Sequence, residues 1–109
     1  MVVGVGIYEL RIAHARSLKD KRMVVRSLRD QVRNLGVSCS EVALQDLHQR
    51  ARLAAAVVGS DQAAVERVLR SVLEKFESCG DASLAGWHSE ILPFDASIDL
   101  QIPGMKFAH

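Results

Sequence analysis

Residues 17–36 read SLKDKRMVVRSLRDQVRNLG, a stretch with a helix start, a helix stop and two distinct side-chain rows. Ser17 is a suitable N-cap, and Asp20 lies where a carboxylate can return a hydrogen bond to the helix start. Five apolar residues then recur at the helical period: Val24, Val25, Leu28, Val32 and Leu35. They predict a helix over about 18–35 with one buried face, and Gly36 can take the left-handed conformation that ends it.

The segments around this helix predict four strands and a second helix. In chain order they are a strand over 2–12, strands over about 37–44 and 53–58, a helix over about 61–78 and a strand over about 84–92. The polar run between the second and third strands is typical of a hairpin. The alanines of the third strand also fit a helix, but the Val57-Val58-Gly59 ending and the helix start at Ser60-Asp61 favour a strand.

The order strand, helix, strand, strand, helix, strand predicts an α+β fold. With right-handed crossovers it gives a ferredoxin-like βαββαβ sandwich, a four-stranded antiparallel sheet with two helices on one face. We expect one domain over 1–93 and a C-terminal tail over 94–109, either flexible or pairing through its alternating segment with a sheet edge or a neighbouring subunit. The expected core residues are Val24, Leu28, Val32, Val65, Leu69 and Phe76.

Composition limits the class of protein. The 109 residues are 49% hydrophobic and 25% charged, which suits a single domain with a core of its own. The net charge of +1 hides an asymmetry, because residues 1–52 carry ten Lys and Arg against five Asp and Glu. This asymmetry indicates an anionic partner on one surface. Cys39 and Cys79 show no metal-ligand or disulfide spacing, and the N-terminus resembles neither a signal peptide nor a membrane span, so we expect a cytoplasmic protein with reduced cysteines.

A row of positive charge follows the first helix. We call it the basic stripe, and its members are Lys19, Arg22, Arg26, Arg29 and Arg33. Their steps of three and four place them on one side of the helix, beside the apolar row. Arginine is suited to bidentate phosphate contact, so the stripe is a candidate RNA-binding surface, although a solvated helix face has the same pattern. Few residues are aromatic, which favours contact with the RNA backbone over stacking on bases.

The polar connection before the third strand is a second candidate site. Its residues are Asp46, His48, Gln49 and Arg50. Loops held by a rigid scaffold often carry function. The simpler interpretation is structural, with Asp46 capping the turn and Arg50 forming an ion pair with it.

Three motifs together resemble the YlxP-like family, domain of unknown function 503. They are Ser17-Leu18-Lys19-Asp20-Lys21-Arg22, Gln45-Asp46-Leu47-His48-Gln49-Arg50-Ala51 and Ala56-Val57-Val58-Gly59-Ser60-Asp61. The resemblance covers about residues 1–90 and implies a small bacterial cytoplasmic protein of ferredoxin-like fold with no established activity. Family members are often encoded beside translation initiation and ribosome maturation genes, which suggests work on RNA or ribosomes. His48 stands where the family usually has Trp, so a stacking role there is in doubt.

The sequence thus predicts a non-catalytic module that binds RNA or the ribosome through the basic stripe. The alternative is a homodimeric ferredoxin-like scaffold or regulatory domain that associates through its sheet, with Tyr8, Leu10 and Trp87 as the apolar surface. An enzyme is disfavoured because no nucleophile and base are recognisable, and we expect no metal site. We also expect no cofactor, because Gly4-x-Gly6 lacks the third glycine of a dinucleotide fingerprint and indicates close backbone approach in a strand.

Overall fold

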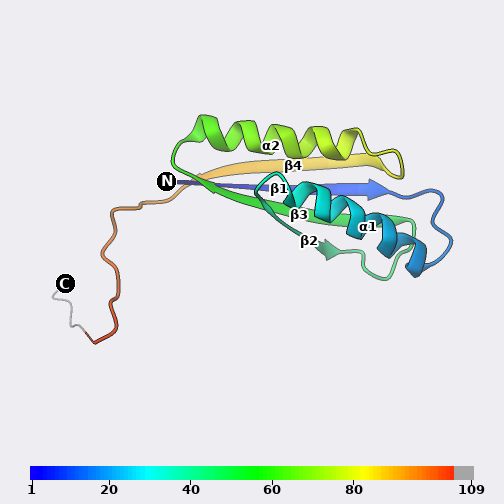
Figure 1. Ribbon diagram of the computed structural model, residues 1–109, viewed down its shortest axis with the longest axis horizontal. Coiled ribbons are helices and arrows are strands. Elements are labelled where there is room, and N and C mark those ends of the chain that lie inside the picture. Colours follow the sequence, from blue (N-terminus) through cyan, green and yellow to red (C-terminus); the bar gives the residue numbers. More distant parts are fainter. Residues whose placement is uncertain (105–109) are drawn as a thin grey trace.

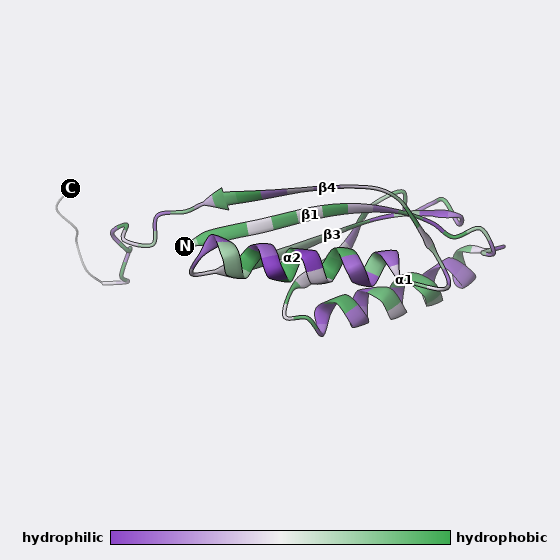
Figure 2. Ribbon diagram, turned by 90° about the horizontal axis from the view of Figure 1, so that it is seen from above, coloured by the Kyte–Doolittle hydropathy of each residue, from purple (hydrophilic) through white to green (hydrophobic). Residues whose placement is uncertain are grey.

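The computed structural model describes residues 1–104, which form one sheet and two helices. The elements are β1 (Val2–Arg11), α1 (Leu18–Arg33), β2 (Ser38–Ala43), β3 (Arg50–Gly59), α2 (Gln62–Glu77) and β4 (Ser83–Pro93). The antiparallel sheet has the order β2-β3-β1-β4, and both helices lie on the same side of it (Figures 1 and 2). This is the predicted ferredoxin-like arrangement, so the fold prediction is confirmed.

The central strand β1 divides its side chains between the two faces of the sheet. Tyr8 and Leu10 lie beneath the helices and are buried, whereas Ile7 points to the opposite face. We call that opposite side the open face, because neither α1 nor α2 covers it (Figure 2). The strand register places these apolar residues on it: Val3, Val5, Ile7, Ala54, Ala56, Val58 and Leu92.

This division corrects the apolar surface expected for a homodimer. Tyr8 and Leu10 belong to the core, with 1% and 0% of their surface exposed. Trp87 is opposite Tyr8 in the sheet and therefore lies on the helix side, not on the open face. The prediction of those three residues as a sheet-face contact is wrong, because residues adjacent in register on neighbouring strands share a face.

The core between the helices and the sheet contains five of the six residues expected there. Leu28 and Val32 of α1 and Val65, Leu69 and Phe76 of α2 are buried, whereas Val24 is half-buried against them. The rings of Tyr8 and Phe76 stack with centroids 4.5 Å apart. Burial raises the pKa of Tyr8 to about 12, since the tyrosinate loses its hydration there.

Gly4 explains how closely α2 can approach the sheet. A Cβ atom at this position would lie 2.5 Å from Val65 Cγ1 and 2.9 Å from Leu69 Cδ1. Only a residue without a side chain leaves room for these two α2 residues. The expected role of Gly4 in close backbone approach is therefore confirmed.

The start of α1 also follows the sequence signals. The Ser17 hydroxyl accepts a hydrogen bond from Asp20 N at 3.1 Å, and the Asp20 carboxylate accepts one from Arg16 N at 3.0 Å. The helix ends at Arg33, two residues earlier than predicted, because the next amides make the tighter bonds of a closing turn around Gly36, whose φ is +84°.

The third strand is a strand, as preferred, but it begins at Arg50 and not at residue 53. The apolar pattern of the sequence predicted that this strand starts at Leu53, after the polar run. In the structure Arg50 and Arg52 extend it, because both pair with β1 and both bind Glu9. Cross-strand ion pairs of this kind stabilise a polar strand end, which the apolar pattern of the sequence does not predict.

Candidate functional site

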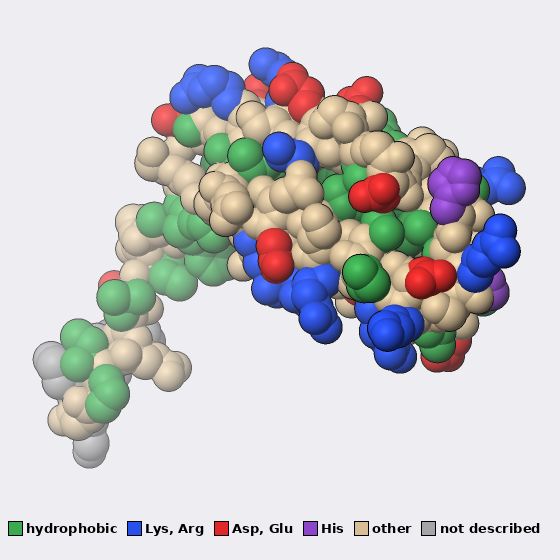
Figure 3. All heavy atoms as spheres, turned by 45° about the vertical axis from the view of Figure 1, so that its right-hand side comes forward, with side chains coloured by type: hydrophobic (Ala, Val, Ile, Leu, Met, Phe, Trp, Pro, Cys, Tyr) green, Lys and Arg blue, Asp and Glu red, His purple; other side chains and the backbone are tan. Residues whose placement is uncertain are grey.

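The basic stripe lies on the side of α1 next to β2, which is an edge strand of the sheet. Arg33 shows this placement directly, since its Nε donates a hydrogen bond to Cys39 O at 3.1 Å. Figure 3 shows Lys and Arg side chains along the lower margin of the molecule and at its right-hand end. The stripe therefore runs along α1 beside the edge strand β2.

The structure divides the basic stripe into two parts. Lys19, Arg22 and Arg26 are exposed, and within residues 1–104 none of them has an ion-pair or side-chain hydrogen-bond partner. Arg33 Nε donates a hydrogen bond to Cys39 O. Arg29 Nε lies 3.6 Å from Asp30 Oδ1, within ion-pair distance but too far for a hydrogen bond. The guanidinium and ammonium groups available to an anion are thus those nearest the start of α1.

Cys39 lies beneath this edge and is buried. Burial raises the pKa of its thiol, although the nearby Arg33 and Arg29 act in the opposite direction. A protonated, buried thiol is a poor nucleophile and a poor metal ligand. Cys39 and Cys79 are both free cysteines, in agreement with the sequence analysis.

Lys21 is a residue that the sequence analysis did not single out. It lies on the buried side of α1, with 2% of its side chain exposed. Its Nζ donates a hydrogen bond to Leu44 O at 2.6 Å. The same Nζ lies 2.8 Å from Glu41 Oε2, and this contact is an ion pair without the geometry of a hydrogen bond. These contacts hold the β2–β3 connection against the start of α1, where the free part of the basic stripe lies.

A signal for this buried lysine was present in the sequence. Lys21 precedes Val25 by four residues and Leu28 by seven, so it lies on their row of the helix. A charged residue in a buried row requires a partner, because an isolated buried charge is costly. The helical period could have identified the residue, although not its partners.

Gln49 connects the β2–β3 loop with the loop between β1 and α1. Its side-chain nitrogen donates to Ala15 O at 3.2 Å and Ala13 O at 3.4 Å, and its backbone carbonyl accepts a hydrogen bond from Ile12 N at 2.8 Å. Of the candidate loop residues, Gln49 is therefore a positioning residue for the loop that leads into α1.

Arg50 has a different partner from the one expected. Together with Arg52 it binds the Glu9 carboxylate, and these hydrogen bonds, from Arg52 first, hold the pKa of Glu9 below its ordinary value. Asp46 is therefore not its ion-pair partner, because β1 brings the Glu9 carboxylate to Arg50 across the sheet. Asp46 and His48 are exposed, and the described residues offer neither a side-chain partner.

Arg11 adds positive charge at the same end of the sheet. It is opposite Arg50 in the β1–β3 register, and both residues line a polar hollow of about 400 Å³ together with Gln49 and Ala85. Like charges on opposed positions repel each other. Glu9 pairs with Arg50 and Arg52, and Arg11 adds a further positive residue at the end of β1, from which the chain leads into α1.

Other chemistry is sparse in the described part of the chain. Within residues 1–104 no group of three His, Cys, Asp or Glu side chains is arranged to hold a metal ion. His88 faces Glu90, with Nε2 3.4 Å from Oε1, on the exposed part of β4. None of the helices described here has the length and apolar character needed to cross a membrane.

Comparisons with known proteins agree with the motif resemblance. Residues 3–88 match the family model described as "Protein of unknown function (DUF503)". The chain is 36% identical over 78 residues to a Bacillus subtilis (strain 168) protein named "Uncharacterized protein YlxP", a match that covers 71% of this chain and 85% of the relative. A de novo designed protein with ferredoxin fold, solved by NMR, covers 98% of this chain and 99% of its own at 10% identity, with a TM-score of 0.47.

Proposed function

Because the chain belongs to the DUF503 family, whose description assigns no activity, we propose from its own surface that it binds RNA through the phosphate backbone. The observation that carries the proposal is that Lys19, Arg22 and Arg26 are exposed beside an edge strand and have no side-chain partner among residues 1–104. Binding phosphates releases counterions from RNA, and this supplies affinity without base recognition.

The open face supports backbone contact in preference to base stacking. RNA-recognition sheets stack bases on aromatic side chains of the uncovered face. Here the described residues of the open face are aliphatic along its centre, and both Tyr8 and Trp87 lie on the helix side. The positive groups at the start of α1 are the better contact for a nucleic acid.

The proposal is tested with Arg22→Glu/Arg26→Glu in binding titrations of two labelled RNAs of unrelated sequence, one single-stranded and one hairpin, at low and physiological salt. Losing two single-strand phosphate contacts should reduce the slope of log affinity against log salt by about 1.4. Both RNAs should lose affinity, because phosphate contact does not depend on sequence. Folding should change little, because neither side chain contacts the core.

The matched control is Arg67→Glu/Arg70→Glu, which reverses two exposed charges on α2. It should bind RNA like the unchanged protein. Equal losses in the two variants would indicate an effect of net charge alone and would contradict the proposal. So would salt-independent binding, or no binding to either RNA or to ribosomes in sedimentation at low salt.

The open face favours a second candidate, a homodimeric scaffold. Ile7, Val58 and Leu92 are exposed there, with 41%, 64% and 50% of their surface accessible. Light scattering of Ile7→Lys should then give a smaller mass than the unchanged protein, whereas Met23→Lys, a matched change at an exposed residue of α1, should not. A monomeric mass for the unchanged protein at all concentrations would exclude this candidate.

A further inference from the structure

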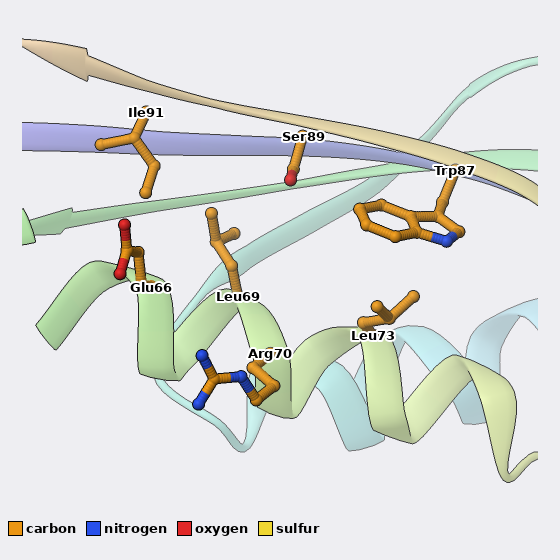
Figure 4. A pocket seen from close by; sticks show the side chains of 7 residues that line it. All are labelled: Glu66, Leu69, Arg70, Leu73, Trp87, Ser89 and Ile91. Carbon is orange, nitrogen blue, oxygen red and sulfur yellow. The ribbon is translucent and has the colours of Figure 1, made fainter. Parts of the chain in front are cut away.

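A groove lies between α2 and β4 on the helix side of the sheet. It has a volume of about 220 Å³ and is lined by Leu69 and Leu73 from α2 and Trp87 and Ile91 from β4, among others. Figure 4 shows the leucine side chains pointing toward the strand and Trp87 pointing toward the helix. Although Trp87 points inward, 54% of its surface is exposed.

The strand beside the groove has a free edge. In the described sheet β4 is an outer strand that pairs with β1 along one side, and it is 11 residues long. Its other side presents backbone N–H and C=O groups that pair with no strand of the described residues. Long exposed edges are templates for another strand, and proteins usually cover or shorten them.

The side chains of β4 alternate between the two faces of the sheet. Trp87 and Ile91 face the groove with the small Ser89 between them, whereas His88, Glu90 and Leu92 lie on the open-face side. A strand added to this edge would place alternate side chains in the groove and on the open-face side, because neighbouring strands place their side chains on the same two faces. Beside Trp87 and Ile91 on one face and His88 and Glu90 on the other, this edge fits a segment that alternates apolar and polar residues.

Such a segment is present in the chain. Residues 98–102 read IDLQI, with Ile98, Leu100 and Ile102 exposed and alternating with Asp99 and Gln101. The chain leaves β4 through a turn in which Asp95 accepts hydrogen bonds from Ser97, and the segment then runs away from the sheet (Figure 1). Its apolar side chains thus contact neither the core nor the groove of their own chain.

We propose that segment 98–102 of a second copy adds to the free edge of β4 as a further strand. Its apolar row then fills the groove against Trp87, and Asp99 and Gln101 lie on the solvated side with His88 and Glu90. A reciprocal exchange satisfies both copies with one two-fold contact. The proposal is independent of RNA binding and of the open face.

The single tryptophan of the chain, Trp87, reports directly on this groove. In the full-length protein its emission should shift to shorter wavelength as the concentration rises, in parallel with a rise in mass from monomer to dimer. Association through the open face would leave the emission unchanged, because Trp87 lies on the other side of the sheet.

Two variants with the same added charge provide the control. Leu100→Asp places a carboxylate in the apolar row and should abolish both the emission shift and its concentration dependence. Gln101→Asp adds the same charge to the solvated side and should retain them. Emission typical of exposed indole at every concentration overturns the proposal. A Leu100-dependent shift that does not vary with concentration also overturns it, since it would show that the segment returns to its own chain.

Discussion

The substitution Lys21→Met removes a buried charge while retaining an unbranched side chain of similar length. Lys21 Nζ has two partners, Leu44 O at 2.6 Å and Glu41 Oε2 at 2.8 Å. Removing one member of a buried ion pair costs about 3–5 kcal/mol, because the other charge remains without a partner. Since 22% of the Glu41 side chain is exposed, although its Oε2 is buried, we expect the lower end, about 3 kcal/mol.

This loss is measurable by urea unfolding at equilibrium, because small domains have total stabilities of about 5–15 kcal/mol. The double variant Lys21→Met/Glu41→Gln removes both charges and should recover about 1–3 kcal/mol relative to the sum of the single changes. The neighbouring Arg22→Met is the control. Arg22 is exposed, so its replacement should alter the free energy of unfolding by less than about 0.5 kcal/mol.

Two results would refute the reasoning. A loss below about 1 kcal/mol for Lys21→Met would show that the ammonium group is solvated and contributes no more than a surface ion pair. Strict additivity of the two single changes would show that Lys21 and Glu41 do not interact. The first result would show that Lys21 does not hold the β2–β3 connection against the start of α1, and the second would leave only its hydrogen bond to Leu44 O in that role.

Three further predictions concern the core. Leu28→Ala should lower the free energy of unfolding by about 2–5 kcal/mol in chemical denaturation, and a change below about 0.5 kcal/mol would remove Leu28 from the core. Gly4→Ala should cost about 1–3 kcal/mol in the same assay, since its new methyl group meets Val65 and Leu69; an unchanged stability would mean that α2 shifts freely. Tyr8, the single tyrosine, should ionise near pH 12 by ultraviolet absorbance while the protein is folded, and because its pKa is raised on folding, stability should fall as pH rises from about 10 to 12. Ionisation near pH 10 in the folded protein would show that the hydroxyl is hydrated.

Local signals in the sequence were sufficient for the elements and their order. Ser17 and Asp61 cap the two helices as their positions predicted, because a cap depends on backbone amides within three residues. The helical period identified Leu28 and Phe76 as core residues for a similar reason, since it needs information from a few turns alone. Gly4 was likewise recognisable within its own strand.

The candidate site was predictable in part. The steps of the basic stripe placed its five residues on one side of α1, but whether each is available depends on β2. Arg33 donates a hydrogen bond to a carbonyl of that strand, whereas the described part of the chain offers Arg22 and Arg26 no side-chain partner. Arg50 similarly received a partner from β1, which is 41 residues away from it in the chain. Such partners are set by strand register, which no short window of sequence contains.

The exposure of Trp87 in β4 and the burial of Lys21 near β2 show the same limit of prediction from sequence at the two edges of the sheet. A lone large aromatic in a strand suggests a packed residue, yet β4 is an outer strand and leaves half of the indole surface uncovered. A lysine in a helix suggests a solvated residue, yet Glu41 and Leu44 provide it with a buried site. The sequence by itself determined the elements, because their signals are local. The tertiary structure decided which side chains are free and which are bound, because burial and pairing depend on strand order and register across the whole chain.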